Sequence, residues 1–118
     1  KKYFVIILLT TFLNVTYGQK EKVANKVVAD SFEMNFNSEN YDAIFLSFSK
    51  EMKSALPLDK TKEFLEDLKT QVGKITKRQF VKYEQSYASY KTNFERGLFA
   101  VNISIDNNSN INGLFVAS

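Results

Sequence analysis

The chain has 118 residues, of which 44% are hydrophobic and 25% are charged, and its formal net charge is +3. This size and balance indicate a single globular domain. The chain contains no cysteine and no histidine, which excludes a disulfide framework, a thiolate nucleophile, a Cys/His zinc site and an imidazole base. We therefore expect no metal site and no cofactor, and only carboxylate, lysine or tyrosine chemistry stays open.

The first 18 residues have the features of a secretory signal peptide. Lys1 and Lys2 precede an apolar run of about a dozen residues, and small residues at 16 and 18 suit a cut after Gly18. The run is shorter than the ~20 residues that a membrane-spanning helix needs. We expect an exported chain, periplasmic or extracellular, that begins at Gln19 and meets the membrane only through its signal peptide.

Apolar residues with helical spacing predict a first helix over Glu21–Phe36. Its predicted apolar face consists of Ala24, Val28, Phe32 and Phe36, widened by Val23 and Val27, whereas Lys22, Lys26, Asp30 and Glu33 are expected to face away.

Two more helices are predicted over Tyr41–Ser49 and Lys60–Val72. Ser38 and Asp59 are the expected N-caps, and Gly73 suits the position after the last turn. The apolar stripe of the third helix is expected to consist of Phe64, Leu65, Leu68 and Val72.

The C-terminal half reads as strands joined by short turns. In the clearest one, alternation places Val101 and Ile103 on a buried face and Asn102 on the other. The predicted strands are Ile75–Tyr83, Tyr87–Phe94, Leu98–Ile105 and Ile111–Val116, with a polar turn at 106–110. Helices followed by consecutive strands predict one α+β domain over residues 19–118, with the helices packed on one side of a curved antiparallel sheet.

Basic residues are densest at Lys74, Lys77, Arg78 and Lys82. We interpret them as solvated surface charges, because a strand would divide them between its two faces. The chain has no basic block of the kind that binds phosphate backbones, so we expect no nucleic-acid partner.

One short motif has the spacing of a nucleophile. Ser47 and Lys50 match Ser-x-x-Lys, in which the serine of penicillin-recognising enzymes attacks a lactam carbonyl. No Lys-Thr-Gly follows, since the nearest segment is Lys91-Thr92-Asn93, and the chain is too short for that two-subdomain fold. We interpret the match as accidental and expect no catalytic residue.

Tyrosine and phenylalanine side chains could instead line an apolar pocket that holds a few hydroxyl groups. The candidate pocket residues are Tyr41, Phe45, Phe64, Tyr83 and Tyr90, and Tyr87 could add a further hydroxyl.

Several segments together resemble a bacterial domain of unknown function. That domain belongs to the cone-shaped superfamily similar to nuclear transport factor two and the ketosteroid isomerases. It commonly follows a signal peptide and precedes a serine hydrolase of the β-lactamase type. The resemblance covers about residues 23–116, and the segments that carry it are Asn40–Phe45, Phe48–Lys53, Ala55–Thr61, Phe64-Leu65 with Leu68, Gly73–Ile75 and Asn112–Phe115.

The resemblance implies a curved sheet wrapped against helices, with a cone-shaped cavity between them. Isomerases and dehydratases of the superfamily place Asp, His or Tyr in the cone, but this chain has no histidine and no aspartate in its strands over 75–94. We therefore expect a noncatalytic accessory domain that assists or packs on a serine hydrolase, in the same chain or in another. A stand-alone binder of a small apolar ligand, a carboxylate-based isomerase or hydrolase, and a homodimer are the alternatives left open.

Overall fold

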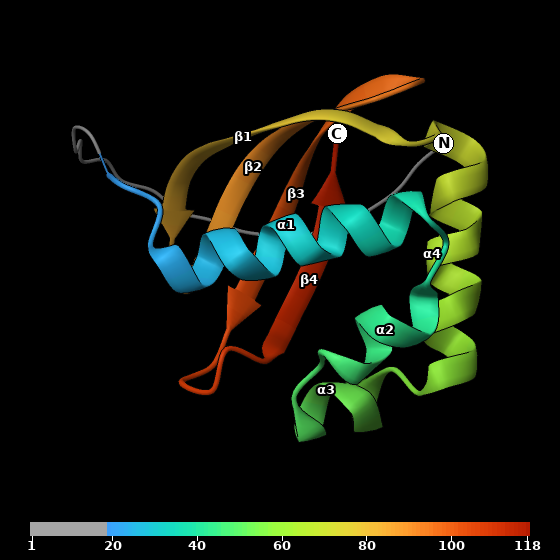
Figure 1. Ribbon diagram of the computed structural model, residues 1–118, viewed down its shortest axis with the longest axis horizontal. Helices are drawn as coiled ribbons and strands as arrows, with labels where there is room; N and C mark the ends of the chain where they lie inside the picture. The colour runs from blue at the N-terminus through green and yellow to red at the C-terminus, as the bar shows by residue number, and fades with distance from the viewer. Residues whose placement is uncertain (1–18) are drawn as a thin grey trace.

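The computed structural model describes residues 19–118 (Figure 1). The predicted signal peptide, residues 1–18, lies outside the described residues. Within residues 19–118, four helices come first and four strands follow, so the predicted α+β class is confirmed. The helices are α1 (Val23–Asn37), α2 (Tyr41–Leu46), α3 (Lys50–Ala55) and α4 (Leu58–Val72), and the strands are β1 (Ile75–Glu84), β2 (Tyr87–Phe94), β3 (Gly97–Ile105) and β4 (Ile111–Ala117).

The strands form an open antiparallel sheet in the order β1-β2-β3-β4, which does not close into a barrel. Figure 1 shows α1 lying across one face of this sheet, with α4 standing beside the end at which β1 begins. We call the face toward α1 the inner face and the opposite face the outer face. The single helical layer therefore covers one side of the sheet, as the sequence predicts.

The core lies between α1 and the inner face. Phe32 and Phe36 of α1 are buried there, and Val101 and Ile103 contribute from β3 as predicted. Asn102, expected to be exposed on the outer face, is buried as well. The reason is an aromatic pair on that face: the rings of Tyr87 and Phe115 lie 5.0 Å apart and come from the strands that flank β3.

The buried face of α1 differs from the prediction. Asn25 and Ala29 are buried, whereas Val23 and Val27 are 79% and 61% exposed. Predicted stripe residue Ala24 is exposed too. The helix is turned so that its polar residues can reach the sheet, as the contacts described below show.

The stripe of α4 is also narrower than predicted. Leu65 is fully buried and Val72 is buried, while Phe64 is 37% exposed. Leu68 packs against the core from a half-buried position. Because α4 packs against the core at its edge, only one narrow line of its apolar residues is covered.

The predicted second helix is interrupted at Ser47. The chain at 47–49 pairs with the start of β4: the Ser49 N–H donates to the Ile111 carbonyl and the Ile111 N–H donates to the Ser47 carbonyl, both at 2.8 Å. This extended segment ends α2 and lets the Ser49 side chain cap α3 by accepting from the N–H of Met52.

The predicted helix caps need correction at two places. The Asn40 side chain, not that of Ser38, caps α2 by accepting from the N–H of Ala43. Pro57, not Asp59, precedes α4. Gly73 follows α4 as predicted, at φ +82°, where a side chain would collide with Glu95.

We predict that Val101→Asp unfolds the protein. Its side chain is buried in the core on the inner face of β3, and an unpaired carboxylate there costs a large part of a stability of about 5–15 kcal/mol. The matched control is Leu98→Asp, on the same strand but half exposed, which should leave thermal unfolding nearly unchanged. Near-native melting of Val101→Asp, measured by circular dichroism, would show that this face is not the core.

Candidate functional site

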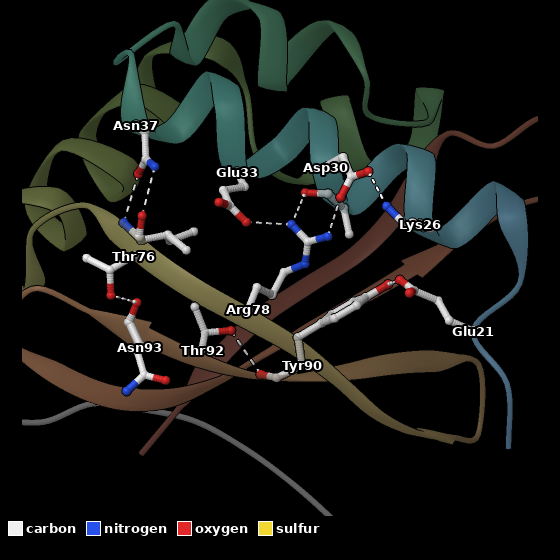
Figure 2. Close-up of polar contacts among 12 residues, drawn as sticks. Glu21, Lys26, Asp30, Glu33, Asn37, Thr76, Arg78, Tyr90, Thr92 and Asn93 are labelled. Atoms are coloured by element: carbon white, nitrogen blue, oxygen red, sulfur yellow. Dashed lines mark hydrogen bonds and ion pairs between the residues drawn. The ribbon is translucent and has the colours of Figure 1, made fainter. Parts of the chain in front are cut away.

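A group of polar side chains joins α1 to the first two strands (Figure 2). We call it the α1–sheet cluster. It is the largest set of interacting polar groups in the described part of the chain. Its members are Glu21, Asn25, Asp30 and Glu33 from α1 and the residues before it, and Arg78, Tyr83 and Tyr90 from β1 and β2.

Arg78 is the centre of the cluster. Its side chain is 11% exposed and donates to the Ala29 carbonyl at 3.1 Å, to Glu33 Oε1 at 2.6 Å and to Asp30. The guanidinium also lies 5.2 Å from the centre of the Tyr90 ring, within the range of a cation–π contact. These contacts engage the planar guanidinium on its edges and on one face, so Arg78 holds α1 to the sheet.

The carboxylate of Asp30 receives two cationic partners. Lys26 Nζ donates to it at 2.8 Å and Arg78 donates to it from the sheet. These hydrogen bonds, first that of Lys26 and then that of Arg78, lower the pKa of Asp30 below its ordinary value. Asp30 is therefore charged at neutral pH.

The arrangement corrects two sequence-based predictions. Asp30 and Glu33 do not face away, and Arg78 is not a solvated surface charge, although its neighbour Lys77 is exposed. The sequence held a signal for this: Arg78 is two residues from Phe80, which places both side chains on the inner face of β1.

Tyr90 is 1% exposed, and its hydroxyl donates to Glu21 Oε2 at 2.6 Å. Burial raises the pKa of this phenol far above its ordinary value, and the hydrogen bond and negative charge of Glu21 raise it further. Tyr90 is therefore protonated at neutral pH and donates its hydrogen bond to Glu21.

Tyr83 is the second candidate pocket residue in this cluster. Its hydroxyl accepts from the Lys22 N–H at 2.8 Å and donates to Asn25 Oδ1 at 3.0 Å. The ring of Phe80 lies 5.0 Å from that of Tyr83 and 5.8 Å from that of Tyr90. The structure thus brings two of the five predicted residues together, with their hydroxyls directed to α1 and the residues before it.

The other three candidates lie elsewhere. Tyr41 and Phe45 belong to α2 and pack against Phe36 and Phe48, with ring centres 6.4 Å and 5.9 Å apart. Burial, followed by the charges of Glu39 and Glu66, raises the pKa of the Tyr41 hydroxyl. Phe64 is exposed on α4. Tyr87, the residue that could add a further hydroxyl, lies on the outer face, because it is three positions from Tyr90 along β2 and side chains alternate between the two faces.

The Ser47–Lys50 pair does not share a helix. Ser47 caps the end of α2, and Lys50 begins α3. The Ser47 hydroxyl donates to the Ile44 carbonyl at 2.5 Å, and Lys50 is exposed. The one-turn geometry through which the lysine of Ser-x-x-Lys acts on its serine is therefore missing.

Comparison with protein families places most of the chain in a described family. The profile of a family described as a protein of unknown function, DUF3887, matches residues 29–114. The chain belongs to the DUF3887 family. No curated protein and no solved structure matches the chain significantly.

The buried polar side chains of this DUF3887 domain are bonded within the fold. Over residues 19–118, every buried side-chain nitrogen or oxygen has a hydrogen-bond partner, and no cluster of acidic side chains could hold a metal ion. No helix in the same range has the length and hydrophobicity to cross a membrane. The α1–sheet cluster can orient a helix and exclude water, which are structural tasks.

We predict that Arg78→Met lowers the free energy of unfolding by about 2 kcal/mol, because Asp30 and Glu33 lose their charged donor. Urea denaturation measures the change. The matched control is Lys77→Met, the exposed neighbour, which should shift stability by no more than about 0.5 kcal/mol. Equal effects of the two substitutions would contradict the assigned role of Arg78.

We predict that Tyr90→Phe destabilises the protein by about 1 kcal/mol at pH 7, since the hydrogen bond to Glu21 is lost. The pKa of the Tyr90 phenol is raised in the folded state, whereas in the unfolded chain it has its ordinary value of about 10. Above about pH 10 the unfolded state therefore loses this proton first, and the stability that Tyr90 contributes falls as pH rises further. The gap between wild type and Tyr90→Phe should therefore shrink in urea titrations above that pH. Tyr87→Phe, on the outer face, is the matched control, and an equal narrowing in both variants would contradict the prediction.

Proposed function

We propose that this DUF3887 domain is a noncatalytic accessory domain of an exported bacterial protein, and that it assists or packs on a serine hydrolase of the β-lactamase type. The observation that carries the proposal is the internal use of its reactive groups. Arg78 and Tyr90, the most buried charged and hydroxyl side chains of the cluster, are both engaged with α1. Neither is left to meet a substrate.

The proposal includes a place in the cone-shaped superfamily similar to nuclear transport factor two. Helices packed over one face of an open antiparallel sheet are compatible with that architecture. Catalytic members direct Asp, His or Tyr into the cone. In this chain the corresponding inner-face hydroxyls, those of Tyr83 and Tyr90, are bonded to Asn25 and Glu21, which favours binding over chemistry.

Export is part of the same proposal. Its support is the sequence of residues 1–18, with Lys1 and Lys2 before an apolar run. The residues just after the predicted cut make specific contacts: Gln19 Oε1 accepts from the Tyr83 N–H at 2.9 Å, and Glu21 binds Tyr90. A mature chain beginning at Gln19 would retain these contacts.

A stand-alone binder of a small apolar ligand is the second candidate. The observation that favours it is partial exposure on the inner face, where Phe99, Leu114 and Val116 pack against the core without being fully buried. Apolar side chains of this kind, with a few hydroxyls nearby, are typical of small-molecule sites.

The noncatalytic assignment predicts that a fluorescent penicillin will not label the purified protein covalently. The Ser47 hydroxyl is bonded to the Ile44 carbonyl and has no lysine on its own helix, so it lacks an activating base. Denaturing gels detect the label, with a penicillin-binding enzyme as positive control. Stoichiometric labelling that disappears in Ser47→Ala would overturn the proposal.

Native mass spectrometry of the protein purified from its source separates the two candidate functions. A complex with a hydrolase chain would support the accessory role. A retained small molecule, with no hydrolase, would support the ligand-binding alternative.

A further inference from the structure

The two edges of the sheet are protected to different degrees. An edge strand offers unpaired backbone N–H and C=O groups that can pair with another strand, and proteins block such edges with side chains, bulges and charges. The sheet has its edges at β1 and β4. Among residues 19–118, the β1 edge is protected at both ends and the β4 edge only near its start.

The β1 edge is blocked at both ends. The Asn37 amide donates to the Ile75 carbonyl at 2.9 Å and accepts from the Ile75 N–H at 2.8 Å. At the other end, the Gln19 side chain accepts from the Tyr83 N–H. The strand also has two register shifts, and its exposed side chains include Lys77 and Lys82.

The β4 edge is blocked at its first residue and has one register shift, between Ile111 and Gly113, beside it. The N–H and C=O of Ile111, whose side chain lies on the inner face, point away from β3 to Ser47 and Ser49. Residues of a strand whose side chains share a face also direct their backbone groups to the same side. Leu114 and Val116 lie on the inner face opposite Ile103 and Val101, so their N–H and C=O groups point outward.

Those outward groups have no hydrogen-bond partner among residues 19–118. The segment Ile111–Ala117 contains no charged residue and no proline, and residues 114–117 are only half-buried. An apolar, uncharged and uncovered edge of this kind is a site for strand addition.

We propose that β4 pairs with β4 of a second copy of the chain, antiparallel about a two-fold axis beside Phe115. In this register Leu114 of each copy faces Val116 of the other, and the outward backbone groups of both residues are satisfied. The two Phe115 rings meet on the outer face, next to Tyr87. The dimer contains one continuous eight-stranded sheet.

Two features favour a second copy as the partner of this edge: β4 carries no charge, and a two-fold pair of β4 strands is closed. Self-pairing places no like charges opposite each other, because β4 carries none. Pairing of β4 with the β1 edge of another copy would displace the Asn37 contacts and would leave free edges that propagate. A two-fold pair is closed. The inference does not depend on the proposed function.

A single cysteine tests the register. The chain has no cysteine, so Phe115→Cys introduces the sole thiol. Opposed residues of a non-hydrogen-bonded antiparallel pair have Cα atoms about 4.5 Å apart, within the range of a disulfide. Mild oxidation of dilute protein should produce a covalent dimer on non-reducing gels. The matched control is Leu98→Cys, also half exposed but on β3, and equal crosslinking of both variants would overturn the proposed pairing.

A measurement on the unaltered chain makes the test independent of the cysteine variant. Light scattering across a dilution series should give twice the chain mass at the higher concentrations. Val116→Pro removes an outward N–H that the ladder with β3 does not use and also replaces a half-buried valine side chain. It should give the monomer mass while keeping the circular-dichroism spectrum of the folded protein. A wild-type protein that stays monomeric throughout would overturn the inference.

Discussion

The structure depends on one interaction between distant parts of the chain, the engagement of Arg78 by α1. A guanidinium that is only 11% exposed needs charged partners, because an unpaired charge in such a place is costly. Asp30 and Glu33 provide them, and the Ala29 carbonyl accepts a further hydrogen bond. This requirement sets the rotation of α1 about its axis, so the carboxylates turn toward the sheet and Val23 and Val27 turn outward.

The same constraint bears on function. Buried polar side chains such as Tyr90, whose hydroxyl donates to Glu21, hold α1 and the residues before it over the inner face. This is why we favour a binding role for the domain. Among residues 19–118, the backbone of β4 is paired on its outer side at Ile111, with the segment between α2 and α3.

Much of the fold could be predicted from the sequence, because strand alternation and turn residues are local signals. The predicted strand Tyr87–Phe94 has the bounds of β2, and Val101 and Ile103 were placed correctly in the core. The candidate site was less predictable. The predicted stripe of α4 contains both Phe64 and Leu65, but only Leu65 is fully buried, and the contacts of α4 in the folded structure decide between them.

The sequence by itself determined the α+β class, the phase of the strands and the absence of imidazole and thiol chemistry, since each follows from composition or from spacing within one element. The tertiary structure decided which side of α1 is buried, which tyrosines meet, and which edge stays open. The physical reason is distance along the chain. The Arg78–Asp30 contact joins residues 48 positions apart, and Tyr90 lies 69 positions from Glu21. Periodicity shows which residues share a face of a helix or strand, but it does not show which distant segment packs against that face.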